Sequence, residues 1–290
     1  MLNTVVLNGQ SNIRESGCVM LLGGFDGLHV GHKKLLARAK TYGLPIGIMT
    51  IYGERRGAPL FTLAERREIF RSLGFAFVCE TEFAKIKDVT ATAFARTLQE
   101  EYNVKAFVCG DDFRFGKGAN GTPKTLQSAT DAEVCVEEIL TLDGEKISSS
   151  SVKNALDSGN VARAQTLLGE RFFLLGQVEQ DRKVGRTLGF PTANIAYPQG
   201  KYAMKIGVYE TCVNVDGTAY KGITNYGARP TFNDGQVWTE TYLDGFSGDL
   251  YGQTLQVQFV RFLRDIRRFE SADALKAQLT EDIRRVKEND

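Results

Sequence analysis

The stretch LLGGFDGLHVGHKKLL, residues 21–36, decides the fold of the N-terminal half of this chain. It reads as the end of an apolar strand, a glycine turn at Gly23 and Gly24, and a helix that begins near Gly31. Glycines at such a turn let the backbone approach a ligand closely. The start of the helix offers unpaired N–H groups and the positive end of its dipole, so an anion-binding turn of an α/β fold is expected.

The same stretch holds the only two histidines of the chain, His29 and His32. Imidazole donates hydrogen bonds to phosphate oxygens and carries positive charge near neutral pH, so charge stabilisation at a phosphorus centre is expected here. A single histidine in this place would more often be a core or capping group. The pair in one glycine turn favours the phosphate role. A zinc site is disfavoured, because the chain has no further histidine and no cysteine lies close by in sequence.

Short apolar runs alternate with helical periods as far as about residue 165. Strands are expected at 18–23, 45–52, 75–80 and 104–110, and helices at 31–40, 61–74, 90–102, 150–159 and 160–169. The helix at 61–74 carries a capping box from Thr62 to Glu65 and stops at Gly74. Strands separated by helices indicate a parallel sheet with βαβ crossovers, as in Rossmann-like folds.

The sequence pattern changes near residue 171, where glycine and asparagine turns begin to separate β-rich runs. These runs cover 171–180, 207–215, 218–227, 237–244 and 253–263. Helical spacing returns only after Ser271. The pattern predicts a small antiparallel β-barrel with a terminal helix, and divides the chain into domains at 1–170 and 171–290.

The composition excludes several classes of protein. The net charge is +1, from 36 basic and 35 acidic residues, so no global field favours nucleic acid or a membrane as a partner. The five cysteines form no C-x-x-C pair and are expected to be buried, reduced thiols of a cytoplasmic protein. Neither a signal peptide nor an apolar run long enough to span a membrane is expected.

The run GGFDGLHVGH, residues 23–32, resembles the H-x-G-H signature of nucleotidyltransferases that cleave ATP between the α- and β-phosphates. With CGDDFRFGKGANG at 109–121, it is similar to the bacterial bifunctional riboflavin kinase/FMN adenylyltransferases, also called FAD synthetases. The resemblance implies that this domain joins the AMP of ATP to FMN and releases pyrophosphate. It implies a catalytic role at the ATP phosphates for His29 and His32, a flavin contact for Asp112, and a nucleotide-binding role for Gly24, Phe25 and Asp26.

The segment ISSSSVK, residues 147–153, resembles the family's Ile-Ser-Ser-Thr-x-Ile-Arg, which closes over the phosphates. The resemblance implies ATP contacts from Ser148, Ser149, Ser150 and Lys153; the serines would also cap the following helix. Lys153 keeps the charge of the family's arginine but loses its bidentate geometry. Where the family has Phe-Asp-Pro-His-Pro, this chain has IYGERRG at 51–57, whose Arg55 or Arg56 would be the phosphate ligand.

The second motif is LGFPTANI, residues 188–195. Pro191 makes the turn rigid, and the oxygens of Thr192 and Asn194 suit a hard cation such as Mg²⁺, although a simple turn at a barrel rim is the alternative. GITNYGARPTF and ETYLDGFSGDLYG follow in the order and spacing of the family's riboflavin kinase domain. The resemblance implies that Thr192 and Asn194 bind Mg²⁺ and the ATP phosphates. It implies that Glu240 is the general base for the riboflavin hydroxyl.

Other residues near this motif are less distinctive. Arg186 is expected to reach an ATP phosphate, with a solvated surface role as the alternative. Trp238, the only tryptophan, is expected in the core rather than against the flavin. The family's Val-x-His-Gly loop reads VEQDRKVGR at 178–186, where Gln180 replaces the histidine and Asp181 replaces the glycine. An acidic side chain there would repel ATP phosphates unless it pointed away or met Mg²⁺.

The sequence therefore predicts an ATP-dependent transferase with two active sites, one making FMN from riboflavin and one making FAD from FMN. Three alternatives remain: a member with only one active half, a flavin-binding regulator without turnover, and a nucleotidyltransferase for another phosphate ester. A regulator would not need to retain the five candidate residues His29, His32, Thr192, Asn194 and Glu240. The kinase-like half argues against the third alternative.

Overall fold

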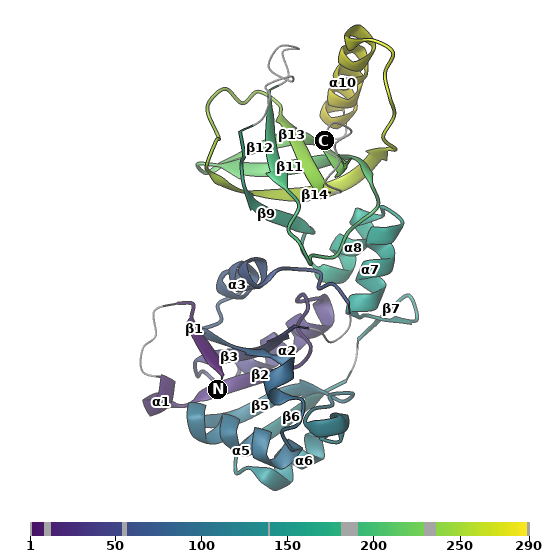
Figure 1. The fold of residues 1–290 in the computed structure, drawn as a ribbon. Helices are drawn as coiled ribbons and strands as arrows, with labels where there is room; N and C mark the ends of the chain where they lie inside the picture. The colour runs from purple at the N-terminus through teal and green to yellow at the C-terminus, as the bar shows by residue number, and fades with distance from the viewer. Residues whose placement is uncertain are drawn as a thin grey trace. The chain divides into compact units, whose positions relative to one another are not determined.

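The computed structural model describes residues 2–8, 13–53, 57–138, 140–180, 191–228 and 236–288. The chain divides into two compact units, Met1–Ser149 and Ser150–Asp290 (Figure 1). The sequence-based expectations for Arg55, Arg56, Asp181 and Arg186 fall outside the described residues.

The first unit is built on a six-stranded sheet of order β1-β4-β3-β2-β5-β6. All neighbours pair in parallel except β1, which runs antiparallel to β4. The strands are β1 (Asn3–Val6), β2 (Cys18–Leu22), β3 (Ile46–Tyr52), β4 (Phe77–Glu82), β5 (Val104–Gly110) and β6 (Glu133–Glu137). The main helices are α2 (Val30–Lys40), α3 (Leu63–Ser72), α5 (Ala91–Tyr102) and α6 (Pro123–Ala129). Short elements complete the unit: α1 (Ile13–Ser16), α4 (Phe83–Ile86), η1 (Lys117–Ala119), β7 (Thr141–Leu142) and β8 (Glu145–Lys146).

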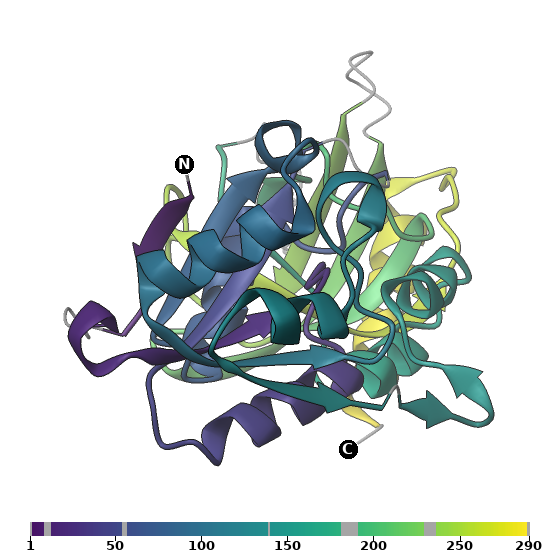
Figure 2. The same cartoon turned by 90° about the horizontal axis from the view of Figure 1, so that it is seen from below.

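Strand β2 occupies the middle of this sheet and is buried along its whole length. Phe94 and Leu98 of α5 and Leu126 of α6 join a core cluster with Met20 and Phe107 of the sheet. Figure 2 shows α5 and α6, in blue and teal, in front of the strands of this unit. The chain adds β3 and β4 on one side of β2, and β5 and β6 on the other. The carboxyl end of β2 is therefore the topological switch point, where open α/β sheets bind ligands.

The predicted elements of this unit are confirmed with small shifts at their ends. The capping box is present with both hydrogen bonds, from the Thr62 hydroxyl and the Glu65 carboxylate. The helix of the opening stretch begins at Val30, one residue earlier than expected, because His29 acts as its N-cap. The pattern did not single out the edge strands β1 and β6, nor α6.

The second unit starts with helices α7 (Ser149–Asp157) and α8 (Val161–Leu168) and continues into a nearly closed antiparallel barrel. Its strand order is β10-β13-β12-β11-β14-β9. The strands are β9 (Phe173–Gln177), β10 (Thr192–Ala196), β11 (Gly207–Val215), β12 (Thr218–Ala228), β13 (Val237–Leu243) and β14 (Thr254–Arg264). The terminal helix α10 spans Ala272–Lys287, with the Ser271 side chain as its N-cap. The predicted barrel with a terminal helix is confirmed.

In the described part of the chain, one backbone contact joins the two edge strands of the barrel. The Glu179 N–H, just beyond β9, donates to the Asn194 carbonyl of β10 at 2.8 Å. Inside the barrel, the hydroxyls of Thr211, Thr224 and Thr241 form a buried chain with two O···O distances of 2.9 Å. The fully buried rings of the barrel are Tyr209, Tyr226, Phe172 and Phe259. Side chains therefore fill the interior.

All five cysteines are free thiols, as predicted; Cys212 is half-buried and the others are buried. None of the helices in the described part of the chain is both long and apolar enough to cross a membrane.

Candidate active sites

The histidine turn joins the carboxyl end of β2 to the start of α2. The His32 N–H donates to Nδ1 of His29 at 3.3 Å, so the His29 side chain caps the helix. Nδ1 of His32 lies 3.0 Å from the Gly27 carbonyl oxygen. The two imidazole rings are stacked, with centroids 3.6 Å apart and planes inclined by 15°. The capping role of His29 is therefore present, and it leaves Nε2 unused by the cap, so the predicted phosphate role and the cap do not exclude each other.

These contacts fix a different tautomer for each ring. His29 accepts a hydrogen bond at Nδ1, so its proton is on Nε2. His32 faces a carbonyl oxygen with Nδ1, so Nδ1 carries its proton and Nε2 is a lone pair. The neutral pair thus offers one N–H donor, at His29, and one acceptor, at His32.

Both rings have depressed pKa values. Burial is the largest cause for each: it lowers the pKa of His29 from 6.5 to about 3 and that of His32 to about 4. The charge of His32 lowers the pKa of His29 further. Both imidazoles are therefore neutral near neutral pH in the free protein, and the positive charge expected from the sequence would require proton uptake when a phosphate binds.

This burial predicts an acid-sensitive fold. Between pH 6.5 and about 4, the unfolded chain binds protons at His29 and His32 that the folded chain does not bind. The free energy of unfolding should be highest above this window and fall as the pH drops through it, by at most about 1.4 kcal/mol per pH unit for each histidine. Calorimetric scans across the window should show a falling transition temperature. The double variant His29→Asn/His32→Asn should show a smaller fall; equal pH slopes in both proteins would contradict this account.

The residues expected to line the nucleotide differ in their surroundings. Gly24 is exposed, with open space where a Cβ would stand. Phe25 is fully buried, has a left-handed backbone (φ +32°), and places its ring edge-on to His32 at 4.8 Å. One oxygen of Asp26 accepts from the Leu60 N–H at 2.9 Å and from Arg66 Nη2 at 3.0 Å. The backbone of Gly24 is thus the open part of this turn, whereas Phe25 and Asp26 are packed into the protein.

A lysine that the sequence did not single out joins this site. Nζ of Lys146, in β8, lies 2.5 Å from the carboxylate of Asp112, which follows β5, and both side chains are about half exposed. Both charges act on His29: Lys146 lowers its pKa and Asp112 raises it. One feature of the sequence could have indicated this lysine: Lys146 directly precedes the segment 147–151, which contains the serines.

The serine segment spans the division between the two units. Ser148 and Ser149 belong to the first unit and are half-buried, while Ser150 is exposed and belongs to the second. Lys153 lies on α7 with its Nζ 4.8 Å from the centre of the Tyr202 ring, within the second unit. The ATP contacts expected of these four residues remain predictions.

In the second unit, strand register places the kinase candidates in one row. Asn194 of β10 lies opposite Glu240 of β13, which lies opposite Asn225 of β12. Glu179 lies opposite Asn194 on its other side, at the contact that closes the barrel. Directly opposed residues of antiparallel strands place their side chains on the same face. The row therefore brings a second carboxylate, Glu179, beside the predicted pair, a residue that the sequence reasoning did not single out.

The groups on this face that could bind a hard cation are oxygen atoms. The Thr192 hydroxyl donates to the Asn194 side-chain oxygen at 3.5 Å. Glu240, directly opposite Asn194 in the neighbouring strand, adds its carboxylate. Such a donor set fits Mg²⁺, which prefers oxygen ligands and is commonly completed by substrate phosphates. Within the described ranges, no cluster of three or more His, Cys, Asp or Glu side chains could hold a metal alone. A cation here would need oxygens from ATP.

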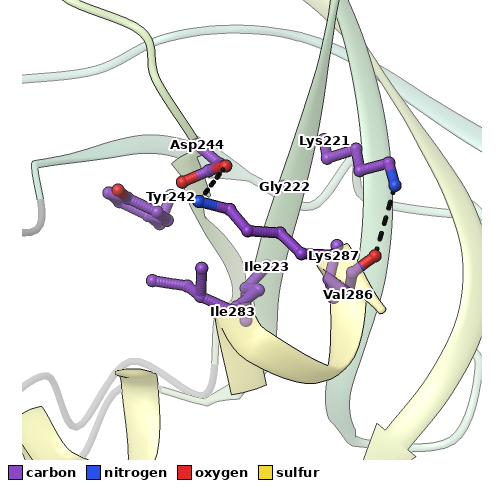
Figure 3. Close-up of a pocket in the computed structure, with 8 residues that line it drawn as sticks. All are labelled: Lys221, Gly222, Ile223, Tyr242, Asp244, Ile283, Val286 and Lys287. Carbon is purple, nitrogen blue, oxygen red and sulfur yellow. Dashed lines mark hydrogen bonds and ion pairs between the residues drawn. The ribbon is translucent and has the colours of Figure 1, made fainter. Parts of the chain in front are cut away.

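A small hollow, partly open to solvent, lies on the same face of the barrel (Figure 3). Ile223 and Tyr242 contribute to its wall from the row next to Glu240, and Ile283 and Val286 contribute from α10. Two contacts tie α10 across the hollow: Lys221 donates to the Val286 carbonyl at 3.3 Å, and Lys287 pairs with Asp244 at 2.9 Å, both drawn as dashed lines. The hollow thus has apolar walls and charged side chains at its edge.

Trp238 lies two residues before Glu240 in β13, so both side chains are on this face. It is half-buried, which corrects the expectation of a core residue.

Comparisons with known proteins match both halves of the chain. A family model described as FAD synthetase matches residues 11–151, and one described as riboflavin kinase matches residues 168–289. Bifunctional riboflavin kinase/FMN adenylyltransferase from Pseudomonas fluorescens is 34% identical, with 96% of this chain and 95% of the relative covered. The protein of the same name from Escherichia coli K12 is 33% identical, with 95% and 94% covered.

A solved structure also matches nearly the whole chain. It is described as a macrolide-efflux protein from Streptococcus pneumoniae, and it superposes with a TM-score of 0.84 at 30% identity, covering 94% of each chain.

Proposed function

Since this chain belongs to the bifunctional riboflavin kinase/FMN adenylyltransferase family, we propose how its residues divide two reactions between two domains. The protein is an ATP-dependent transferase that phosphorylates riboflavin to FMN and adenylylates FMN to FAD. The proposal gives the adenylyl transfer to residues 1–170 and the kinase reaction to residues 171–290. The two family models, which end at 151 and begin at 168, support a division in this region.

In the first domain, the stacked histidines at the start of α2 are the observation on which the proposal rests. The His29 Nε2–H donates to a phosphate oxygen, together with the N–H groups of the helix start and the open backbone of Gly24. His32 presents a lone pair, which would repel a phosphate oxygen. The approaching anion raises the pKa of His32, and the ring takes up a proton at Nε2 and becomes a second donor. Negative charge that develops on the departing pyrophosphate is thereby stabilised.

Other residues complete the proposed adenylyl site. Ser148, Ser149 and Ser150 offer hydroxyls at the start of α7, where an anion is favoured. Lys153 and Lys146 supply positive charge, and Asp112 contacts the flavin substrate. The pairing of Lys146 with Asp112 supports a place for both beside His29.

In the second domain, we propose that Glu240 accepts the proton of the riboflavin 5′-hydroxyl as that oxygen attacks the γ-phosphorus. Thr192 and Asn194 would hold Mg²⁺, which neutralises phosphate charge when bound, and Arg186 would contact a phosphate. The shared face of Asn194 and Glu240 supports this assignment.

The direct test is to incubate the purified protein with riboflavin, ATP and Mg²⁺ and to separate the flavins by chromatography. FMN should appear first and FAD later, and FMN supplied alone with ATP should give FAD and pyrophosphate. Omitting Mg²⁺ in the presence of a chelator should stop the kinase step. FMN that accumulates without FAD, or FMN that is converted while riboflavin is not, would identify a member with one active half.

Two further expectations remain predictions. Replacing ATP with CTP should not support adenylyl transfer; efficient use of CTP with another phosphate ester would favour the alternative nucleotidyltransferase. A cytoplasmic location, without nucleic-acid or membrane partners, is expected from the cysteine content and the charge balance of the chain.

A further inference from the structure

Arg66, in the first turn of α3, makes an unusually complete set of contacts for a buried cation. Its side chain is 5% exposed. Nε donates to the Phe61 carbonyl at 3.0 Å, Nη1 to the Thr50 hydroxyl at 3.0 Å and to the Ile51 carbonyl at 3.5 Å. Nη2 donates to the Asp26 carboxylate at 3.0 Å. The guanidinium is therefore the common partner of three chain segments.

These segments meet at the carboxyl edge of the sheet. Thr50 and Ile51 form the end of β3, Phe61 leads into α3, and Asp26 lies in the turn after β2. Asp26 also accepts from the Leu60 N–H, so the same carboxylate holds the approach to α3. Arg66 thus connects the histidine turn to the end of β3 and to the residues that lead into α3.

The contact between Arg66 and Asp26 affects the position of the histidines. Phe25, the preceding residue, has a left-handed backbone that a bulky side chain adopts only when its surroundings hold it there. Its buried ring packs edge-on against His32 at 4.8 Å. The hydrogen bonds of Asp26 are the nearest anchor for this strained residue. A shift at Asp26 would therefore reach the His32 ring through a single residue.

We propose that Arg66 is a positioning residue for the adenylyl transfer: through Asp26 and Phe25 it holds the turn that carries His29 and His32. This inference rests on the adenylyl site proposed above. A lysine has one nitrogen where arginine has three, so it cannot serve the four acceptors of Arg66 together. Displacement of the turn by an ångström would cost about 100-fold in rate, as is typical of misplaced catalytic groups.

The test compares Arg66→Lys and Arg66→Met with Arg71→Met. Arg71 is the matched control, because it lies on the same helix and pairs with Glu68 of that helix, with both side chains about half exposed. In both Arg66 variants, kcat for FAD formation should fall about 100-fold while KM for FMN stays within about threefold. Arg71→Met should keep the wild-type kcat. Riboflavin phosphorylation by the same molecules, unchanged throughout, reports that the protein is intact.

Asp26→Asn should repeat the loss, and the double variant Arg66→Met/Asp26→Asn should be no slower than the slower single variant, because both act through one contact. A variant that melts at a lower temperature yet keeps the wild-type kcat would show a purely structural role and overturn the inference. If Arg66→Lys and Arg66→Met both form FAD normally while His29→Ala does not, the inference fails and the proposed site stands. If His29→Ala is also normal, the proposed site itself is wrong.

Discussion

Replacing His29 with alanine is expected to abolish FAD formation from FMN while FMN formation from riboflavin continues at the wild-type rate. His29 supplies the only free N–H donor of the neutral pair, because the proton of neutral His32 is used at Gly27. Losing one preorganised donor costs about 100- to 1,000-fold in kcat, and the loss of the helix cap adds to the effect. Paired assays of the two reactions on one preparation measure both rates.

The matched variant is His29→Asn, which separates the donor from the cap. Asparagine is a good N-cap and accepts from the His32 N–H, but it has no group where Nε2 stands. It should restore the wild-type melting temperature while leaving FAD formation impaired. Recovery of FAD formation in His29→Asn would mean that His29 only caps α2. Loss of both reactions in a folded His29→Ala protein would contradict two independent sites.

Glu240→Gln is expected to stop FMN formation and to leave adenylylation of FMN unchanged. The amide keeps the size of the side chain but cannot take a proton from the riboflavin hydroxyl, and removal of a general base costs about 100- to 10,000-fold. Trp238, on the same face and the only tryptophan, gives an independent reading. Quenching of its fluorescence by riboflavin should be preserved in Glu240→Gln, so the loss is one of chemistry and not of binding.

Glu179→Gln is the control for this prediction, because Glu179 is the other carboxylate of the row and flanks Asn194 on the opposite side. Normal FMN production by Glu240→Gln would remove Glu240 from the role of base. If Glu179→Gln were the inactive variant instead, the base would lie on the other side of Asn194.

Local sequence pattern was sufficient for much of the fold. The Thr62 capping box and the glycine turn before α2 involve neighbours in sequence, so their residue types alone indicated them. The strands β1 and β6 have only four and five residues and lie at the edges of the sheet, where exposure weakens the apolar signal. Strand β10 was not among the predicted strands, because the polar Thr192 and Asn194 on one face alternate with the apolar Ala193 and Ile195 on the other.

The chemistry of the sites depended on contacts that are distant in sequence. Asp26 was expected to line the nucleotide, but its partner Arg66 is 40 residues away. The charge state of the histidines follows from burial, which in turn depends on packing against Phe25 and α2. Glu240 and Asn194 became neighbours only through the register of β10 and β13. The motifs thus indicated the candidate residues of each site, while the contacts of those residues with distant parts of the chain required the three-dimensional structure.

The threonine chain inside the barrel limits where substrates travel. Among the described residues, hydroxyls and aromatic rings fill the space between the strands and leave no room there for a molecule the size of riboflavin. On the proposed assignment, vitamin and nucleotide therefore react on the outside of the barrel wall. Enlarging the interior, for example by Thr224→Ala, would weaken the wall without opening a new route for either substrate.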